Sequence, residues 1–249
     1  MSGTGVSGTG VESTRPLIVA IDGPSGVGKS TAARRLARRL GVPYLDTGAM
    51  YRAVALAVLA RGVDPEDEAA VLAVAARADV GLESQADGSF AVLLDGEPVA
   101  ARVRAPRVGE VASKVSRYPE VRERMVALQR ACAARLGAVL EGRDIGTRVF
   151  PDTPHKFFVT ARPEVRHRRR HEQLRELGKE VPLDDVAREM SERDRRDATR
   201  EASPLTDDGT YRVVDTSDLD VDEVVVRMEE AVRGARPRGP AVSSRRPRR

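Results

Sequence analysis

The sequence predicts an α/β fold in which a five-stranded parallel sheet is flanked by helices on both faces. Short apolar runs alternate along the chain with longer segments of helical periodicity, which is the order of strand–helix–strand crossover units. The runs are apolar at nearly every position, as expected for strands covered on both faces. A length of 249 residues suits one large domain or two small ones.

The predicted strands are short segments rich in Val, Ile and Leu. The five strands of the parallel sheet lie at 17–22, 44–46, 138–140, 156–160 and 212–215. Two further runs, at 80–83 and 90–94, predict a small antiparallel insertion, which the turn sequence Asp95-Gly96 follows.

The predicted helices occupy most of the chain between these strands. They lie at 30–40, 48–60, 67–78, 107–116, 120–136, 164–177, 184–200 and 220–232. Gly41 ends the first helix, and the Asp-Pro-Glu sequence at 64–66 precedes the third. Pro119 separates two neighbouring helices, and Asp220 with Glu223 three residues later forms a capping box at the start of the last helix.

The composition excludes several classes of protein. One cysteine, Cys132, leaves no partner for an intrachain disulfide, so a stapled secreted scaffold is excluded. No apolar run reaches the roughly 18 residues that a membrane span needs, and we expect no membrane association. The first residues lack the basic start and apolar core of a signal peptide, so we expect a cytoplasmic protein.

Both ends of the chain differ in composition from the part between them. Residues 1–15 repeat the sequence SGTGV, and 235–249 are rich in Pro, Gly, Ser and Arg, so we expect both to be disordered. The folded domain is expected over 16–234. The last 15 residues hold six Arg and no acid, and removing these charges from the net +4 leaves −2. The pI near 9.5 therefore describes a tail, and we expect no specific nucleic-acid partner.

A phosphate-binding loop follows the first predicted strand and begins the first predicted helix. The sequence at 23–30 matches G-x-x-x-x-G-K-[ST] without a mismatch. The motif requires a strand before it and a helix after it, and both are predicted here. This placement argues against the alternative of a chance glycine-rich turn. Its backbone N–H groups and the helix N-terminus attract phosphate oxygens. Lys29 can reach the β- and γ-phosphates, and Ser30 can bind Mg²⁺. The fold class is therefore a P-loop NTPase-type sheet that binds a nucleoside triphosphate. The loop residues are Gly23, Pro24, Ser25, Gly26, Val27, Gly28, Lys29, Ser30 and Thr31.

Three arginine-containing motifs follow the ends of later strands or lie on a charged helix. In Asp46-Thr47-Gly48-Ala49-Met50-Tyr51-Arg52, Thr47 is expected to cap a helix, and Arg52 suits a second anion or is simply solvated. In the sequence at 141–147, Arg143-Asp144 places opposite charges at a cleft edge or forms an ordinary turn ion pair. On the helix that contains 193–200, the residues 193, 197 and 200 share one face, which is a binding face or an exposed salt-bridged one.

Taken together, these motifs resemble bacterial cytidylate kinases, which are nucleoside monophosphate kinases. The resemblance covers about 16–232 and rests on IDGPSGVGKST, LDTGAMYRA, ASKVSRYPEVRER, EGRDIGTRVFPD and SERDRRDATREASPL. It implies an inserted monophosphate-binding region at about 47–118 and a mobile helical lid at about 164–182. Glu141 stands where the family often has Asp.

The resemblance also implies roles for individual residues. ATP would bind with Mg²⁺ at the loop, with Lys29 and the lid residue Arg168 near the transferring phosphoryl group. The implied CMP-binding residues are Arg52, Arg143 and Arg200 at the phosphate, with Asp46 and Thr47 beside them; Arg193 and Asp197 at the ribose; and Ser113, Arg122 and Asp144 at the cytosine. The implied reaction is in-line transfer of the γ-phosphoryl group of ATP to CMP or dCMP in pyrimidine nucleotide metabolism, by a monomer.

The residue types agree with this chemistry. A phosphate monoester has its second pKa near 6 and is mostly ionised at pH 7, so it needs no general base. It needs alignment with ATP and relief of repulsion between two anions, which Lys29, Mg²⁺ and several Arg supply. Asp144 can accept a hydrogen bond from the cytosine amino group and repels the O4 oxygen of uracil.

Two other functions remain open from the residues alone. One is a P-loop kinase for another small acceptor, such as UMP, dTMP or a metabolite hydroxyl. The other is an ATPase that binds RNA or ribosomes through its Arg-rich tail, although only eight residues are Tyr or Phe and Trp is absent, which leaves little for base stacking.

Overall fold

The computed structural model describes residues 16–234, and the extensions predicted to be disordered, 1–15 and 235–249, lie outside the described residues. The chain forms a five-stranded sheet in the order β2-β6-β1-β7-β8 and a three-stranded sheet in the order β3-β4-β5. All pairs of the larger sheet are parallel, and those of the smaller sheet are antiparallel. The predicted fold class is therefore confirmed.

Most elements follow one another with short connections, and the longest within 16–234 is the segment 200–211 between α7 and β8. The strands are β1 (Ile18–Asp22), β2 (Tyr44–Asp46), β3 (Val80–Ser84), β4 (Phe90–Leu94), β5 (Glu97–Pro98), β6 (Ala138–Gly142), β7 (His155–Thr160) and β8 (Arg212–Asp215). The α-helices are α1 (Lys29–Leu40), α2 (Thr47–Ala60), α3 (Glu68–Arg77), α4 (Pro106–Val115), α5 (Pro119–Leu136), α6 (Pro163–Glu176), α7 (Leu183–Thr199) and α8 (Val221–Gly234). Two short turns of other helix types are η1 (Arg102–Arg104) and the π-helical η2 (Ile145–Val149).

The parallel sheet separates two apolar cores. Successive side chains of a strand point to opposite faces, so Val19 and Ile21 pack with α1 and α8, while Ala20 packs with α2 and α5. All three are fully buried. The continuous apolar run of β1 therefore results from burial on both faces, as the sequence predicts.

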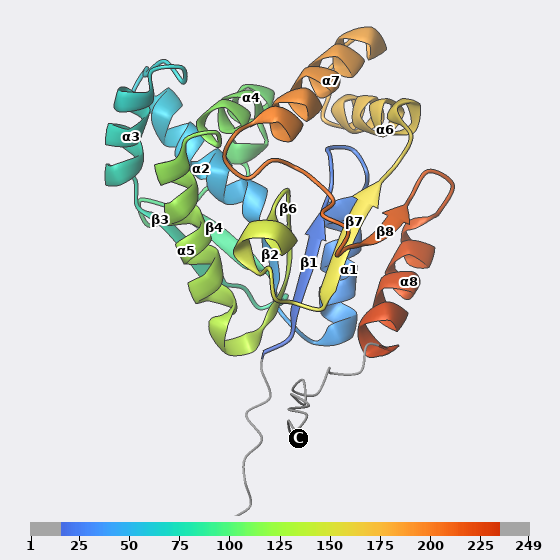
Figure 1. The fold of residues 1–249 in the computed structure, drawn as a ribbon. Coiled ribbons are helices and arrows are strands. Elements are labelled where there is room, and N and C mark those ends of the chain that lie inside the picture. The colour runs from blue at the N-terminus through green and yellow to red at the C-terminus, as the bar shows by residue number, and fades with distance from the viewer. Residues whose placement is uncertain (1–15, 235–249) are drawn as a thin grey trace, which may run out of the picture.

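The carboxyl ends of the strands meet at one edge of the sheet. In the register of the ladder, Asp22 of β1 lies beside Gly142 of β6, and Asp46 of β2 lies beside Glu141. Figure 1 shows the loop between β1 and α1 at this edge, below helices α6 and α7. Ligands bind at this edge in parallel α/β sheets, so the sheet brings the predicted motifs together.

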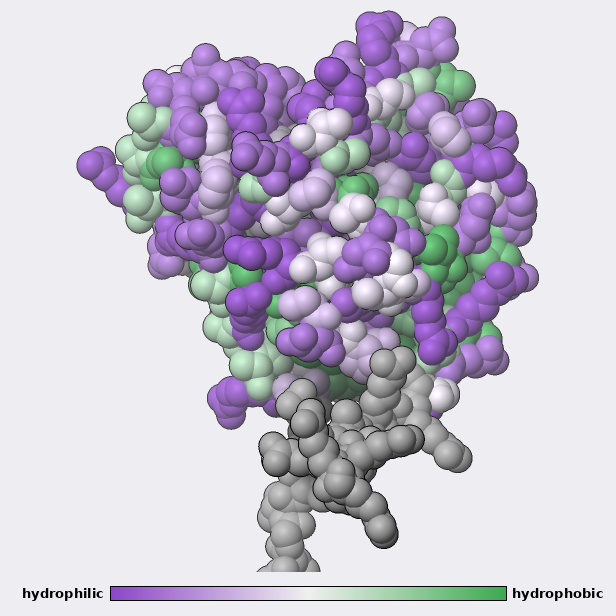
Figure 2. Space-filling model, in the orientation of Figure 1, coloured by the Kyte–Doolittle hydropathy of each residue, from purple (hydrophilic) through white to green (hydrophobic). Residues whose placement is uncertain are grey.

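Helices α6 and α7 bury few of their residues. Figure 2 shows hydrophilic residues over the outer part of α7 and over the opposite upper region near α3. Only three residues of α7, Val186, Met190 and Asp197, are buried. No helix among residues 16–234 has the length and apolar character needed to cross a membrane.

The observed elements differ from the predicted ones mainly at short segments. Helix α1 begins at Lys29, one residue before the predicted start. The strand β5 and the turns η1 and η2 were not predicted. The predicted capping box of α8 is confirmed, since the Asp220 N–H donates to Glu223 at 2.9 Å and the Glu223 N–H donates to Asp220 at 2.8 Å.

Candidate active site

The phosphate loop is held tightly against the sheet. Gly23 has a φ of +148°, and a Cβ added there would lie 2.1 Å from the carbonyl oxygen of Val159 in β7. Only glycine can therefore bring the loop this close to β7. At the other end of the loop, Gly28 adopts a left-handed conformation directly before α1. The predicted strand–loop–helix context of the motif is confirmed.

Lys29 is the first residue of α1, and its side chain folds back into the phosphate loop. Its side chain is buried, and its Nζ donates a hydrogen bond to the carbonyl oxygen of Pro24 at 2.5 Å. Burial, and next to it the charge of Arg143, lowers the pKa of Lys29. The loop lysine and Arg143 are therefore near enough to repel each other, and an anion between them would relieve that repulsion.

Ser30 and Glu141 bring hydroxyl and carboxylate oxygens to the start of α1. Ser30 and Thr31 are exposed, so their hydroxyls are accessible from outside. Glu141 is buried and accepts a hydrogen bond from the Tyr44 hydroxyl at 2.5 Å. Burial holds the pKa of Glu141 above its usual value, and the charge of Lys29 and the Ser30 hydroxyl oppose this effect only in part.

A group of arginines lies beside the loop. Arg193 is half-buried, and this burial together with the charge of Arg143 lowers its pKa to about 10. Arg52 and Arg170 lower it further, so four guanidinium groups lie near one another. Arginine is rarely perturbed to this extent, and such crowding is relieved when a phosphate binds.

Asp197 connects two of the predicted phosphate-binding arginines. It accepts from Arg143 Nε at 2.8 Å, and its other oxygen lies 4.0 Å from Arg200 Nη1. Burial alone would raise the pKa of Asp197, but Arg143 and Arg193 outweigh burial and hold it low. Arg143 from one predicted motif is thus brought together with Arg193, Asp197 and Arg200 from another.

The predicted cytosine-binding residues form a second buried cluster. Arg122 and Asp144 make an ion pair in which the two side chains are 4% and 5% exposed. Arg122 also donates to the Ser116 carbonyl at 2.9 Å and lies over the Tyr51 ring at 5.2 Å. The Ser113 hydroxyl accepts from Arg196 Nε at 3.3 Å. This arrangement fixes one donor group and one acceptor group in a site with little water.

The structure corrects the predicted role of Thr47 as a helix cap. The N-cap of α2 is Asp46, whose carboxylate accepts from the Ala49 N–H at 3.1 Å. The other Asp46 oxygen lies 3.9 Å from Arg52 Nη1. Thr47 is buried and donates its hydroxyl hydrogen to the Glu141 carbonyl at 2.6 Å, which joins β2 to β6.

Helix α6, which contains Arg168 and its neighbouring arginines, places one of these neighbours, Arg166, against the loop. Arg168 is exposed, whereas Arg166 is buried and its Nη1 lies 3.3 Å from the Ser25 carbonyl. Arg170 is partly buried and is among the charges that perturb Arg193.

Asp22 is a buried carboxylate that the sequence analysis did not assign. It accepts from the N–H groups of Ile145 and Gly146, at 3.0 and 2.8 Å, and from the Tyr211 hydroxyl at 2.8 Å. Burial, opposed by these backbone hydrogen bonds, raises the pKa of Asp22 from 3.8 to about 6. The only signal for this residue in the sequence is an acid at the end of an apolar strand. The Asp22 carboxylate holds η2, the turn that directly follows Asp144.

Replacing Tyr211 should therefore change stability in a pH-dependent way. Because the folded-state pKa of Asp22 is raised, its charge costs stability above about pH 6, and the cost fades as Asp22 becomes protonated. Tyr211→Phe removes a donor to that charge. We expect it to lower the free energy of unfolding by about 1 kcal/mol at pH 8 and by less at pH 5, measured by urea unfolding.

Tyr118→Phe is the matched control, because the Tyr118 hydroxyl donates to the neutral carbonyl of Pro65 at 2.9 Å. Its loss should be the same at both pH values. An equal loss at pH 5 and pH 8 for Tyr211→Phe would contradict the role given to Asp22.

Comparison with known proteins identifies the family. The family model described as cytidylate kinase matches residues 19–234. The chain is 51% identical over 210 residues to a cytidylate kinase of Corynebacterium glutamicum, covering 84% of this chain and 91% of the relative. It is 49% identical over 207 residues to one of Pelotomaculum thermopropionicum, covering 83% of this chain and 92% of the relative.

A solved structure agrees with the fold at low sequence identity. The crystal structure of an uncharacterized protein from Eubacterium ventriosum has a TM-score of 0.51 and 15% identity, and the match covers 88% of this chain and 99% of that one. This likeness concerns the fold alone. The family match extends over the phosphate loop, the group of arginines and the Arg122–Asp144 pair, and the chain belongs to the cytidylate kinase family.

Proposed function

We propose that this protein transfers the γ-phosphoryl group of ATP to CMP, and to dCMP, giving ADP and CDP or dCDP. The observation that carries the proposal is that β1 and β6 pair in parallel, so the phosphate loop that follows β1 and Arg143, which follows β6, lie at the same edge of the sheet. The charge of Arg143 accordingly lowers the pKa values of both Lys29 and Arg193. A phosphate loop and a guanidinium cluster that adjoin can hold two anions in line. The names of the relatives support CMP as the acceptor.

The donor side is suited to ATP with Mg²⁺. The accessible Ser30 hydroxyl and the nearby Glu141 carboxylate are hard oxygen groups of the kind that Mg²⁺ prefers, and the metal keeps waters and phosphate oxygens as its other ligands. Ser30 would bind the ion, and Glu141 would orient its water. When bound, the ion neutralises charge on the β- and γ-phosphates. Residues 23–31 would hold the triphosphate through backbone N–H groups, with Lys29 at the β- and γ-phosphates.

The acceptor side is suited to a nucleoside monophosphate. Arg52, Arg143 and Arg200 would bind the phosphate, with Asp46 orienting Arg52 and Thr47 supporting the end of β6. Arg193 and Asp197 would contact the ribose hydroxyls. The phosphate oxygen is already ionised near pH 7, so transfer is direct, without a covalent enzyme intermediate and without a general base.

The base would be read by the buried polar cluster. Asp144 accepts from the cytosine amino group, Arg122 donates to the opposite edge, and the Ser113 hydroxyl completes the contact. A site built on polar pairing discriminates strongly, because the wrong base leaves buried groups unpaired.

The region at 47–118 would then be the monophosphate-binding region, and the segment at 164–182 a lid. The lid would close over both nucleotides, exclude water and bring its cations, Arg168 included, to the transferring group. Arg168 is exposed and its side chain is therefore available to a bound nucleotide.

A substrate panel tests the proposal. The purified full chain is assayed with ATP and Mg²⁺ against CMP, dCMP, UMP, AMP and dTMP, with ADP formation coupled to NADH oxidation. We expect the highest kcat/KM for CMP or dCMP, at least tenfold above that for UMP. Preference for another monophosphate would assign a different acceptor, and steady ATP hydrolysis stimulated by RNA, without transfer to CMP, would support the ATPase alternative.

A further inference from the structure

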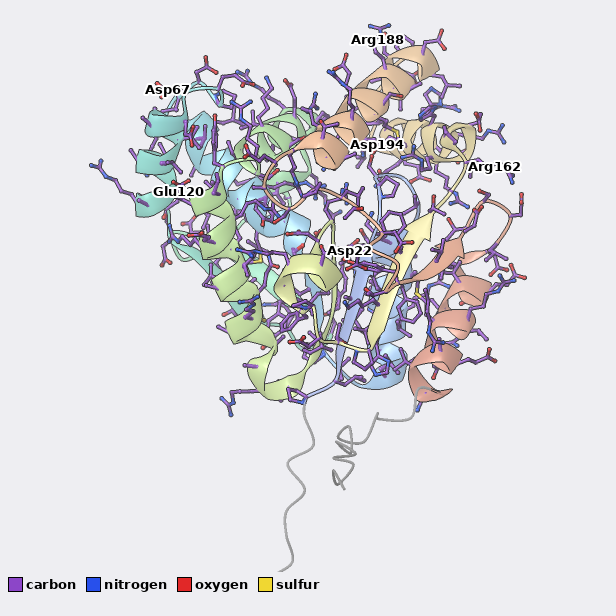
Figure 3. All side chains as sticks on the ribbon, viewed as in Figure 1. Asp22, Asp67, Glu120, Arg162, Arg188 and Asp194 are labelled. Atoms are coloured by element: carbon purple, nitrogen blue, oxygen red, sulfur yellow. The ribbon has the colours of Figure 1, made fainter. Side chains whose placement is uncertain are left out.

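Helix α7 faces two sites at once. Its residues Arg193 and Asp197 lie beside Arg143 on the acceptor side. Asp194 is one residue further along the helix than Arg193, about 100° around the axis, and therefore points in another direction. Figure 3 shows Asp194 on the part of α7 that lies near the sheet, with Arg188 at the outer part of the same helix.

Asp194 reaches the phosphate loop through one arginine. The Nη1 of Arg166 on α6 lies 2.5 Å from Asp194 Oδ2 and 3.3 Å from the carbonyl oxygen of Ser25. The side chain of Asp194 is 21% exposed and that of Arg166 is 10% exposed, so this pair is shielded from solvent far more than a surface ion pair. A continuous set of polar contacts therefore runs from α7, through Arg166 of α6, to the phosphate loop.

Close packing reinforces these contacts. A Cβ added at Gly26 would lie 2.9 Å from Met190 Cε of α7 and 3.0 Å from the Arg166 carbonyl oxygen of α6. Gly26 also has a φ of +77°. Both helices thus contact the loop directly, so a shift of either one toward Gly26 would displace the loop.

The polar atoms at this junction are only partly satisfied. Within the described part of the chain, Ser25 Oγ, Arg166 Nε and Asp194 Oδ1 are buried without a hydrogen-bond partner. Buried polar atoms normally have partners, and an unpaired one destabilises the folded state. Ser25 and Arg166 present donors, which an anion in the loop can satisfy. Asp194 also acts on the acceptor side, because its charge contributes to raising the pKa of Arg143 against burial.

We propose that Asp194 is a positioning residue that couples the two nucleotide sites, by fixing Arg166 of α6 on the phosphate loop from the helix that holds the acceptor. This inference rests on the proposed function. Acceptor bound at Arg193 and Asp197 orders α7, Asp194 then holds Arg166 against Ser25, and the loop is preorganised for the triphosphate. Linkage requires the effect to be reciprocal, so each nucleotide tightens the binding of the other.

The test measures this coupling as a ratio of affinities. The dissociation constant of a non-hydrolysable ATP analogue with Mg²⁺ is measured by calorimetry, without CMP and at saturating CMP. We expect CMP to tighten the analogue at least fivefold in the wild-type protein, within the usual range of coupling between sites. In Asp194→Asn the factor should fall below twofold, while the affinity for the analogue alone changes less than threefold.

Asp185→Asn is the matched control. Asp185 is also on α7 and accepts from Arg188 at 2.8 Å, but in a largely exposed ion pair, with the two side chains 49% and 69% exposed. The same change of charge there should leave the coupling factor at the wild-type value. Arg166→Gln removes the other member of the buried pair and should lose the coupling as Asp194→Asn does, so it decides the question if Asp194→Asn does not fold.

Three results would overturn the proposal. The first is a wild-type coupling factor near one, where the factor is the ratio of the dissociation constants of the ATP analogue without and with CMP. The second is a coupling factor in Asp194→Asn equal to that of the wild type. The third is that Asp194→Asn loses the same affinity for the analogue with and without CMP. Turnover of CMP by the wild-type protein is recorded separately. If the wild type phosphorylates CMP and the factor does not depend on Asp194, only the coupling role fails, whereas absence of turnover means that the proposed function fails.

Discussion

Lys29→Met is expected to lower kcat/KM for phosphoryl transfer by about 10³-fold, the order found when one preorganised charged donor is removed from a transition state. The Lys29 ammonium is buried in the loop with Pro24 as its hydrogen-bond acceptor, so it can turn from that carbonyl to phosphate oxygens without crossing solvent. Methionine is an unbranched side chain one atom shorter than lysine, and it removes the charge. The KM for CMP should change less than threefold, because the arginines of the acceptor side are intact.

The same substitution should not reduce stability. Burial and Arg143 lower the pKa of Lys29, which means that the folded protein holds the charged ammonium less favourably than the unfolded chain does. At pH 7.5 we therefore expect Lys29→Met to unfold in urea at the wild-type concentration or above it. A substitution that removes activity without reducing stability marks a residue that serves function and not folding.

Lys114→Met serves as the control. Lys114 lies on α4, where its Nζ pairs with Glu110 at 3.3 Å and with Glu66 at 3.6 Å. Its kcat/KM should stay within twofold of the wild-type value. A Lys29→Met protein with more than a tenth of wild-type kcat/KM would show that the loop lysine does not contact the transferring group.

The sheet and its helices were predictable because their determinants are local. Each parallel strand is a short apolar run bounded by turn residues, and each predicted strand of the larger sheet overlaps the observed one over most of its length. The phosphate loop was also predictable, since its glycines, lysine and serine are consecutive. Residues 23–30 carry their own conformational requirements, and Gly23 and Gly28 meet them with positive φ values.

Distant contacts decided the features that were not predicted. The π-helical turn η2 is held by Asp22 and Tyr211, which come from β1 and from the segment before β8. Asp46 and Thr47 are both good capping residues, and only the contact of Thr47 with the Glu141 carbonyl leaves the cap to Asp46. No local pattern encodes either outcome.

The orientation of α6 shows a second limit of sequence reasoning. The run at 166–171 is charged or polar at every position, so no apolar stripe indicates which side packs on the protein. The family resemblance implies a role for Arg168 and its neighbours, and among them the structure buries Arg166, whose backbone packs against Gly26. The acceptor arginines were easier to find, because three of their motifs lie next to strand ends or on one helix face.

Asp144→Asn is expected to narrow the preference for CMP over UMP by about 10- to 100-fold in kcat/KM, which corresponds to the usual worth of a specific contact to a base edge. A carboxylate only accepts hydrogen bonds, so it pairs with the cytosine amino group and repels the O4 oxygen of uracil. An asparagine amide presents one acceptor and one donor group and can satisfy either base. The measurement is kcat/KM for CMP and UMP with the wild-type and variant proteins.

Loss of stability must be separated from loss of recognition in this variant. Asp144 is the buried partner of Arg122, and removing one member of such a pair costs up to about 3–5 kcal/mol when the other charge is left alone. Asparagine retains an acceptor for Arg122, so the loss should be smaller. Val74→Ala, which removes buried apolar volume from α3, lowers stability away from the base-binding cluster and should keep the wild-type ratio of CMP to UMP. A ratio in Asp144→Asn within threefold of the wild-type ratio would mean that Asp144 holds Arg122 in place without reading the base.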